Sequence, residues 1–563
     1  MSKSLWRRAA SWGLAVALAG LALQAVRLAL HKAFSIDEFQ YAHAAWLVSR
    51  GQVPYRDFFE VHLPLVYQAL APLFTVLGDD PRNVLALRAA MLVPLAGTCV
   101  AVAVLNRREG RAVALLAPVL LLALPPFARF ATEVRPDALA TALFLGALAA
   151  LSWRPATRAR GFGAGALLVA AAWGSQKVLF FGGAVGAVLL VDLALRRGRA
   201  PALLPTPGAF LAGVGTAAAA VAAYLTVTGS WGAWWQWCFV WAAEHQRDYP
   251  GFSWRKYLVP VLWEQPWAFT LAALGLAASA RAWWRSGRTR WSDPELLLLL
   301  AVPLTFGSYA LQRAPYPYSL LPFLGVLAPF MARGAGVVLD VPRARAVGTV
   351  ALAALLAVQG VRLEALLDGG GNARQREVLA RIATLTGPED VAYDNSGGYV
   401  SRPHAHFYFY TDAYLRGAIV GTLERDVPEA LVARGCVLRV DDLRTSGLPP
   451  ALRRFLDAHY QPYDGDLFLW GQRYEAPGGG PLEDRFLAVR EARYFVEPAD
   501  VLTRGALFID GVRVTEPELA LARGEHTVRY EGPAGGFHLL WLPRDGQRWT
   551  PRPGLPPTYS RLF

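Results

Sequence analysis

Long apolar blocks, separated by short connections rich in arginine, fill most of the chain up to residue 361. A helix needs about 20 apolar residues to cross the hydrocarbon core of a bilayer. Several blocks are somewhat shorter, so we expect the ends of these helices to be imprecisely defined and some of the helices to be tilted. The pattern predicts about eleven membrane-spanning helices, over residues 9–30, 84–105, 112–127, 138–153, 161–173, 178–195, 207–227, 266–284, 296–311, 318–331 and 346–361.

Basic residues indicate which side of the membrane each connection occupies, because short loops rich in lysine and arginine stay in the cytoplasm. Lys3, Arg7 and Arg8 precede the first block, which is too long for the core of a signal peptide. We therefore expect an uncleaved anchor with a cytoplasmic N-terminus. If each successive connection lies on the opposite side of the membrane from the one before, every connection on the cytoplasmic side is basic. An odd number of spans then places the C-terminal region outside. The inner clusters are Arg107, Arg108 and Arg111; Arg154, Arg158 and Arg160; Arg196, Arg197 and Arg199; Arg281, Arg285, Arg288 and Arg290; and Arg333, Arg343 and Arg345.

The sequence beyond residue 362 has the mixed pattern of a water-facing domain. Helical and strand patterns alternate there, which is typical of a small α/β unit. In the β-rich end, Asp510 and Gly511 supply the positive φ angles of a hairpin turn between 507 and 514, and we expect a small β-sandwich. The predicted domains are 1–363, 364–476 and 477–563. The predicted helices are 374–385, 428–434 and 450–459, and the predicted strands are 391–393, 436–440, 467–470, 527–530 and 537–542.

Composition supports a membrane protein, because 54% of the residues are hydrophobic and only 18% are charged. The net charge of +13 would suggest nucleic acid if the basic residues formed one surface patch. They lie instead between apolar blocks, so we expect no nucleic-acid partner. Cys99, Cys238 and Cys436 cannot build a disulfide framework or a paired-cysteine metal site.

An acidic pair, Asp37 and Glu38, follows the first apolar block. A carboxylate at the membrane boundary is partly desolvated yet reachable from water, which suits a general base. The alternative is that Asp37 caps the following helix.

The stretch around this pair resembles the first outer loop of membrane glycosyltransferases of the C-type (GT-C) fold that use polyprenyl-phosphate sugars. The family includes the protein O-mannosyltransferases and the bacterial aminoarabinose transferases of lipid A. The resemblance implies inverting sugar transfer from a lipid-linked donor to an acceptor outside the cytoplasmic membrane, with Asp37 as catalytic base and Glu38 supporting it. The elements that carry it are Asp37, Glu38, Tyr41, Gly51, Pro54, Tyr55, Glu60, Pro64 and Leu65.

The leaving group of such a reaction is an anionic lipid phosphate, so cations must meet the charge that develops there. Lys177 lies in a short polar break between two blocks, where the family has a lysine near the start of a span. The alternative is a lysine that marks the end of a span by snorkelling. Tyr318 matches a family tyrosine that contacts the donor phosphate, and Arg313 precedes it in the same loop. An interfacial aromatic belt is the alternative for the tyrosine.

Two further groups are predicted to contact substrate. The first outer connection carries Tyr55, Glu60 and His62, and His62 stands where the aminoarabinose transferases have a lysine. No cofactor is firmly predicted; a divalent cation is conceivable, but Glu60 and His62 alone fall short of a metal site. The second outer connection carries Glu133, Arg135 and Asp137. Their alternative role is to cap the helix that follows.

The sequence therefore predicts a glycosyltransferase of the bacterial inner membrane that uses a polyprenyl-phosphate-sugar donor. The acceptor can be a lipid, a glycan or a protein, and membrane lipids surround the chain. An oligosaccharide ligase, a transporter or flippase for lipid-linked sugars, and an inactive scaffold are the alternatives. A transporter should show paired repeats and broken segments at mid-membrane. Here the polar residues gather near one face and no repeat of fixed period is present.

Overall fold

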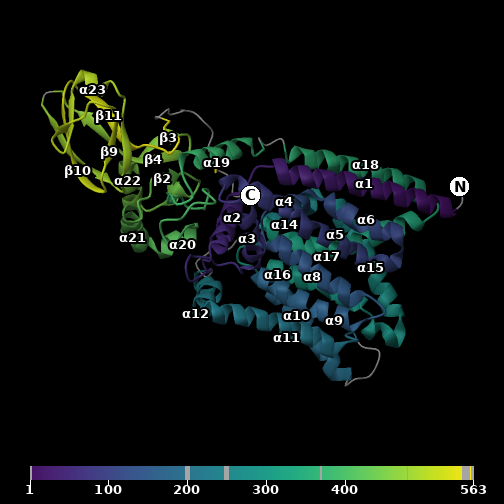
Figure 1. The fold of residues 1–563 in the computed structure, drawn as a ribbon. Helices are drawn as coiled ribbons and strands as arrows, with labels where there is room; N and C mark the ends of the chain where they lie inside the picture. The colour runs from purple at the N-terminus through teal and green to yellow at the C-terminus, as the bar shows by residue number, and fades with distance from the viewer. Residues whose placement is uncertain are drawn as a thin grey trace. The chain divides into compact units, whose positions relative to one another are not determined.

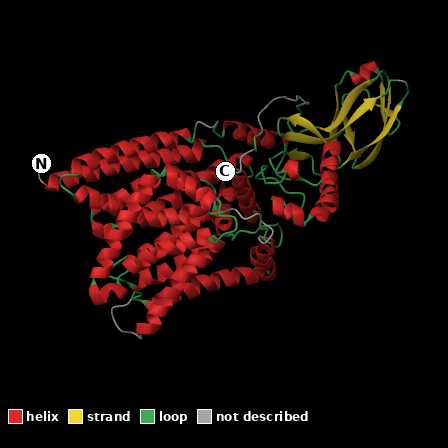
Figure 2. Cartoon of the chain, turned by 180° about the vertical axis from the view of Figure 1, so that it is seen from behind, coloured by secondary structure: helices red, strands yellow, loops and turns green. Residues whose placement is uncertain are grey.

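The computed structural model describes residues 3–196, 203–245, 253–367, 371–478, 480–547 and 558–559. It contains two compact units that interleave along the chain. The helical unit comprises Met1–Ala33, Glu60–Leu70 and Leu85–Gly371. The mixed unit comprises Phe34–Phe59, Ala71–Val84 and Asn372–Phe563. Figure 2 shows that the strands all belong to the C-terminal part of the chain. Each unit is described by itself.

Every predicted apolar block is helical in the structure (Figure 1). By length and composition, six helices of the described residues can cross a membrane, or seven if α6 and α7, bent by 77°, form one broken span. The chain is thus a multi-pass membrane protein, while the count of about eleven spans stays a prediction. The corresponding helices are α1 (Lys3–His31), α4 (Val84–Ala90) with α5 (Leu92–Leu105), α6 (Arg111–Leu122) with α7 (Pro125–Ala131), α8 (Pro136–Ser152), α9 (Arg158–Gly174), α10 (Gln176–Arg196), α11 (Pro207–Val227), α15 (Pro266–Arg285), α16 (Glu295–Ala310), α17 (Leu321–Asp340) and α18 (Arg345–Ala365).

Shorter helices connect these elements. Arg197 and Arg199, two of the arginines predicted to lie on the cytoplasmic side, are outside the described residues. The connecting helices are α3 (Leu65–Leu77), α12 (Trp231–Trp235), a π-helical turn (Gln236–Trp241), α13 (Ala242–His245), α14 (Arg255–Glu264), and the 3-10 turns η1 (Pro81–Asn83), η2 (Arg107–Glu109), η4 (Gly287–Ser292) and η5 (Pro317–Leu320).

Glycines let helices of this unit approach one another closely. A Cβ atom added at Gly275 of α15 would meet the carbonyl oxygen of Phe330 in α17, and Gly334 of α17 is equally crowded against α15. Gly165 of α9 and Gly213 of α11 pack in the same way. Small residues commonly bring transmembrane helices into contact, because apolar side chains gain little by leaving lipid.

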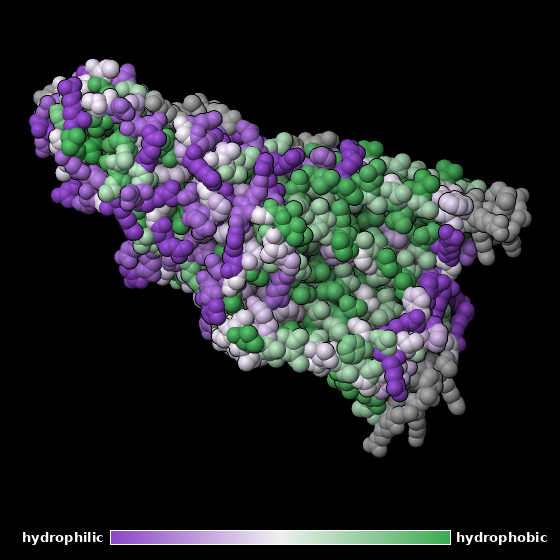
Figure 3. All heavy atoms as spheres, viewed as in Figure 1, coloured by the Kyte–Doolittle hydropathy of each residue, from purple (hydrophilic) through white to green (hydrophobic). Residues whose placement is uncertain are grey.

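The outer flank of the helical unit is apolar. α1 and α18 lie side by side (Figure 1), and Gln24 Nε2 donates a hydrogen bond to the carbonyl oxygen of Gly360 at 2.9 Å. Both helices expose large aliphatic side chains such as Val16 and Val350. Figure 3 shows hydrophobic atoms spread over this flank. An apolar surface of this kind is expected where lipid replaces water.

Two sheets form the core of the mixed unit. The larger has the strand order β1-β2-β4-β11-β6-β9, with β3 also paired to β4, and the smaller has the order β5-β10-β7-β8. Phe486 and Tyr494 join the two sheets through rings 5.3 Å apart. The strands are β1 (Ala392–Tyr393), β2 (Leu438–Val440), β3 (Tyr460–Asp464), β4 (Leu467–Ala476), β5 (Leu482–Ala488), β6 (Ala492–Glu497), β7 (Ala506–Ile509), β8 (Val512–Arg513), β9 (Glu518–Leu521), β10 (Gly524–Glu531) and β11 (Gly535–Trp541).

The strand β4 pairs with β2 of the predicted α/β region and with β11 of the predicted β-sandwich. One sheet therefore runs through both regions, so the separate small sandwich is not seen. The predicted hairpin is confirmed, since Asp510 (φ 53°) and Gly511 (φ 78°) join β7 to β8. The boundaries of the domains 1–363, 364–476 and 477–563 stay predictions.

Helices pack around these sheets, and one of them is longer than predicted. The helix expected to begin at Pro428 begins at Val420 instead. Its buried stripe of Leu423, Val427 and Leu431 stabilises the turns before the proline, although a proline costs the helix one hydrogen bond. The helices are α2 (Ile36–Ser49), α19 (Ala373–Leu385), α20 (Ala413–Ala418), α21 (Val420–Ala433), α22 (Pro450–His459), α23 (Val501–Arg504) and the 3-10 turn η6 (Thr445–Gly447).

The helix α2, which carries the acidic pair, belongs to the mixed unit. Its Phe39 ring lies 4.9 Å from the ring of Tyr559, and its His43 ring lies 4.8 Å from that of Phe409. Farther along the same loop, the amide of Phe59 donates a hydrogen bond of 2.9 Å to the carbonyl oxygen of Phe407. A segment close to the N-terminus is thus part of the core formed by the C-terminal residues.

Candidate functional site

Lys177 lies at the start of α10, just after the break in the helices at Ser175. Its Nζ atom is 2.9 Å from Oδ1 of Asp137, and the Ser175 hydroxyl lies 3.3 Å from the same oxygen. Asp137 is in the first turn of α8, where the helix dipole favours a negative charge. The Nζ atom also lies 4.8 Å from the centre of the Tyr318 ring. The structure therefore brings together three residues predicted from separate parts of the sequence.

Arg135 also lies close to the Tyr318 ring. The guanidinium carbon of Arg135 lies 4.2 Å from the centre of the Tyr318 ring, a cation–π distance. Arg135 also forms an ion pair with Glu133, and Glu133 forms a second ion pair with Lys32. All three charged side chains are buried. We name this set the Lys177 cluster: Lys32, Glu133, Arg135, Asp137, Ser175, Lys177 and Tyr318.

Three cations and two carboxylates make the Lys177 cluster positive overall. Buried charges are expensive unless they are paired, and charged residues in membrane proteins usually mark a functional site. Lys177 is the cation that remains partly accessible, with 25% of its side chain exposed. An anionic group arriving at Lys177 would therefore meet a preorganised cation. Sequence reasoning missed Lys32, although a lysine at the end of an apolar block is a recognisable signal.

Glu60 and His62 form a compact pair in the helical unit. The His62 Nδ1 atom is 2.7 Å from Oε1 of Glu60, and the amides of Val61 and His62 donate to the same oxygen. Burial raises the pKa of Glu60, but His62 and these amides outweigh it, so the pKa lies below its ordinary value. Gln176, next to Lys177, donates a hydrogen bond to the carbonyl oxygen of Val61. The pair thus lies beside the start of α10.

Tyr316 and Arg313 lie in the connection between α16 and α17. Tyr316 stacks on Tyr318, with ring centres 5.5 Å apart. Arg313 lies between α16 and η5 with an exposed side chain. Over the described ranges of the chain, no group of three or more histidine, cysteine or acidic side chains is arranged to hold a metal ion.

In the mixed unit, α2 positions the acidic pair. Ser35 is the N-cap, and Glu38 Oε2 accepts a hydrogen bond of 3.0 Å from the Ser35 amide. This capping box buries Glu38 completely. The cap is therefore Ser35 rather than Asp37, and Asp37 in the first turn keeps 15% of its side chain exposed. The capping box thus fixes Glu38, and Asp37 is the more exposed of the two carboxylates.

Arg444 holds the Asp37 carboxylate. Its Nη2 atom lies 3.3 Å from Oδ1 of Asp37, and its Nη1 atom donates to the carbonyl oxygen of Asn395. The Arg444 amide donates to Oδ1 of Asp442 at 2.7 Å, and the Ser396 hydroxyl donates to Oδ2 of Asp442. Arg444 is buried. Sequence reasoning missed it, because 407 positions separate it from Asp37 and no local pattern marks the pair.

The loop after β1 carries a second buried carboxyl, Asp394. The amides of Ser396, Gly397 and Gly398 all donate to it. Burial and the neighbouring Asp442 raise the pKa of Asp394, while the three amides, which stabilise the ionised carboxylate, lower it by less.

Tyr55, also predicted, occupies the left-handed region with a φ of 73°. A tyrosine is strained there, and such strain persists only where the surroundings fix the backbone. Its amide donates a hydrogen bond of 2.9 Å to the carbonyl oxygen of Phe58. Asp37, Glu38 and Tyr55 belong to the mixed unit, and the other predicted site residues belong to the helical unit.

No family model matches the chain, and no curated protein matches it in sequence. Solved structures do match its fold. The apo crystal structure of ArnT from Cupriavidus metallidurans matches with a TM-score of 0.55 and 15% identity, over 82% of this chain and 98% of that one. The same protein bound to undecaprenyl phosphate matches with a TM-score of 0.53 and 15% identity, over 79% and 95%.

An apo oligosaccharyltransferase from Archaeoglobus fulgidus matches with a TM-score of 0.50 and 13% identity, over 80% of this chain and 73% of that one. These neighbours are glycosyltransferases of the GT-C fold that depend on polyprenyl phosphates. The chain described here therefore has the GT-C fold, as the first outer loop predicted. At this level of identity, the likeness concerns the fold alone.

Proposed function

We propose that this protein transfers a sugar, with inversion, from a polyprenyl-phosphate donor to an acceptor on the outer side of a bacterial cytoplasmic membrane. The observation that carries the proposal is the Lys177 cluster, in which Lys177 and Arg135 both lie within cation–π distance of the Tyr318 ring. The fold shared with ArnT, one structure of which contains undecaprenyl phosphate, supports a lipid-linked donor.

In this proposal the Lys177 cluster receives the donor phosphate. The bond between the sugar C1 atom and the phosphate oxygen breaks, and the lipid phosphate leaves with an additional negative charge. Lys177 meets that charge, and Asp137 holds its ammonium in place until the donor arrives. Tyr318 and Arg313 also contact the donor phosphate. The side chains that orient the sugar or the acceptor are Glu60, His62 and Glu133.

Asp37 acts as the base. Its carboxylate removes the proton from the acceptor hydroxyl or amine as that group attacks C1 from the face opposite the phosphate. A positioned base contributes about 10²–10⁴-fold to the rate of such a step. Arg444 is a positioning residue that keeps the Asp37 carboxylate oriented, and Tyr55 shapes the loop around it. The basic connections favour a cytoplasmic N-terminus and an outer location for the mixed unit.

Replacement of Asp37 tests the proposal. Asp37→Asn should lower transfer about 10²–10⁴-fold while donor binding and thermal stability stay at the wild-type level. Asp390→Asn is the matched control, because Asp390 also lies in the mixed unit, pairs with an arginine and has 16% of its side chain exposed. Turnover is measured with the full chain in proteoliposomes, using lipids and glycans whose masses differ between cells with and without the protein. Full turnover by Asp37→Asn would contradict the assignment of the base.

A further inference from the structure

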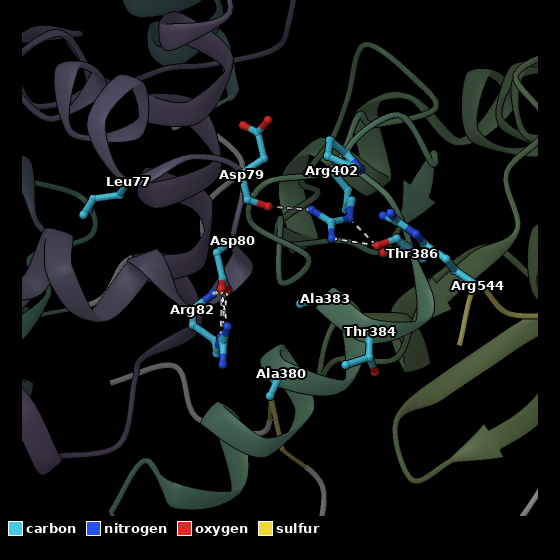
Figure 4. Close-up of a pocket in the computed structure, with 11 residues that line it drawn as sticks. Leu77, Asp79, Asp80, Arg82, Ala380, Ala383, Thr384, Thr386, Arg402 and Arg544 are labelled. Atoms are coloured by element: carbon cyan, nitrogen blue, oxygen red, sulfur yellow. Dashed lines mark hydrogen bonds and ion pairs between the residues drawn. The ribbon is translucent and has the colours of Figure 1, made fainter. Parts of the chain in front are cut away.

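The mixed unit contains a cavity of about 450 Å³ that plays no part in the proposed transfer. It lies beside the C-terminal half of α19 (Figure 4), and the helix contributes the small side chains of Ala380 and Ala383 to its wall. Three arginines from different segments also line it: Arg82 of η1, Arg402 of the loop after β1, and Arg544 after β11.

Arg402 forms a fixed, positively charged part of this wall. Its Nε atom donates to the Thr386 hydroxyl at 2.8 Å, and its Nη1 and Nη2 atoms donate to the carbonyl oxygens of Asp79 and Thr386 (Figure 4). A further bond goes to the carbonyl oxygen of Ser401. Within the described part of the chain, all of its hydrogen bonds thus go to uncharged oxygens. Burial lowers the pKa of Arg402 to about 10.

The carboxylates of the cavity are already paired. Asp80 forms a bidentate pair with Arg82, and the Asp79 carboxylate pairs with Arg50. Arg544 is different, because no hydrogen bond or ion pair holds its guanidinium among the residues that the structure describes. The side chains that line the cavity therefore comprise three arginines and two carboxylates, a net positive charge, although Asp80 and the nearby Asp390 also attract Arg402.

We propose that this cavity binds a phosphate ester, either a sugar phosphate or the headgroup of a phospholipid. Guanidinium groups match phosphate oxygens through two parallel hydrogen bonds, and the net positive lining fits the negative charge of a phosphate ester. A volume of about 450 Å³ exceeds the needs of a bare phosphate and leaves room for a polar substituent. The site is independent of the transfer reaction, because it uses none of the residues assigned to that reaction.

Binding of glucose 1-phosphate to the full chain in an uncharged detergent tests this site. Equilibrium dialysis should show saturable binding that Arg544→Ala weakens about tenfold or more, the loss expected for one charge-assisted contact. Ala383→Glu, which adds a carboxylate to the wall, should weaken it at least as much. Arg513→Ala, at another exposed arginine of the mixed unit, is the control and should bind like the wild type.

Soluble dihexanoyl phosphatidylglycerol, kept below micelle formation, provides the second probe. Binding of glucose 1-phosphate alone identifies a soluble sugar phosphate, and binding of the lipid alone identifies a headgroup. Lys177→Met and Asp37→Asn should both retain this binding, which separates it from the donor site. The proposal is overturned if neither probe binds, or if Arg544→Ala and Ala383→Glu bind like the wild type.

Discussion

The Lys177 cluster and the Asp37 site each join a carboxylate to a cation, but they are built differently. Lys177 and Asp137 are 40 positions apart and lie at the ends of neighbouring membrane helices. Asp37 and Arg444 are 407 positions apart and meet because α2 packs into the core of the mixed unit. Two helix ends close together in the sequence thus hold the cation proposed to bind phosphate, whereas the proposed base is oriented by a residue from a distant part of the chain.

The two sites also differ in how their charges are shielded. In the Lys177 cluster, Lys32 and Glu133 expose only 7% and 2% of their side chains. Removing one partner there leaves an uncompensated charge in a poorly solvated place. Asp37, with 15% of its side chain exposed, is more accessible to water than Lys32 or Glu133. We therefore expect changes in the Lys177 cluster to be strongly coupled, and changes around Asp37 to act mainly on its orientation.

After the loss of the proposed base in Asp37→Asn, the next largest effect should come from Lys177→Met, which removes the cation proposed to meet the leaving phosphate. Turnover should fall about 10²–10³-fold, the cost of losing one preorganised electrostatic contact. Asp137→Asn alone should cost about tenfold, and the double variant should be no worse than Lys177→Met, because Asp137 acts through Lys177. Lys256→Met, at an exposed lysine of α14, is the control. Independent, additive losses in the double variant would show that the two residues do not act as a unit.

A second effect should appear in the stability of the mixed unit at acidic pH. His43 of α2 is fully buried, and burial lowers its pKa to about 3. Because the unfolded chain binds a proton near pH 6.5 and the folded one does not, this contribution to stability falls as pH drops from 6.5 toward 3. At pH 5 the loss should be about 2 kcal/mol.

Thermal unfolding of the full chain between pH 7 and pH 5 measures this loss. His43→Phe should remove its share of this pH dependence and leave that of the buried His404, whose pKa is also lowered by burial, while His31→Asn, at an exposed histidine of α1, should leave the pH dependence unchanged. The packing of α2 described here is wrong if His43→Phe unfolds with the same pH dependence as the wild type.

The smallest effect should come from Arg444→Met, which releases one oxygen of Asp37. We expect kcat to fall about tenfold with the KM for the donor unchanged, since a single charge-assisted bond of 3.3 Å is lost. Arg444→Lys should regain part of the activity. Arg490→Met, which removes the partner of Asp390 in the same unit, is the matched control. A change in donor KM instead of kcat would contradict a role in positioning the base.

Much of the fold could be predicted from periodicity. The apolar blocks all became helices, and Asp510 with Gly511 made the expected hairpin turn, because both signals depend only on neighbouring residues. The separate sandwich was not seen, because β4 pairs with both β2 and β11. These pairings join segments that are far apart in the chain, so local sequence patterns do not reveal them. The start of α21 was misplaced because the burial of Leu423 outweighs the local signal of Pro428.

The sequence by itself determined that the apolar blocks are helices fit to cross a membrane, and it predicted Asp37, Lys177 and Tyr318 as site residues. Hydrophobic length and a local motif carry that information without any knowledge of packing. Only the tertiary structure decided that Arg135 and Lys177 both lie near the ring of Tyr318, that Glu38 takes part in the cap of α2, and that Arg444 holds Asp37. Such contacts join residues that are far apart in the chain, and they exist only after the core that brings those residues together has formed.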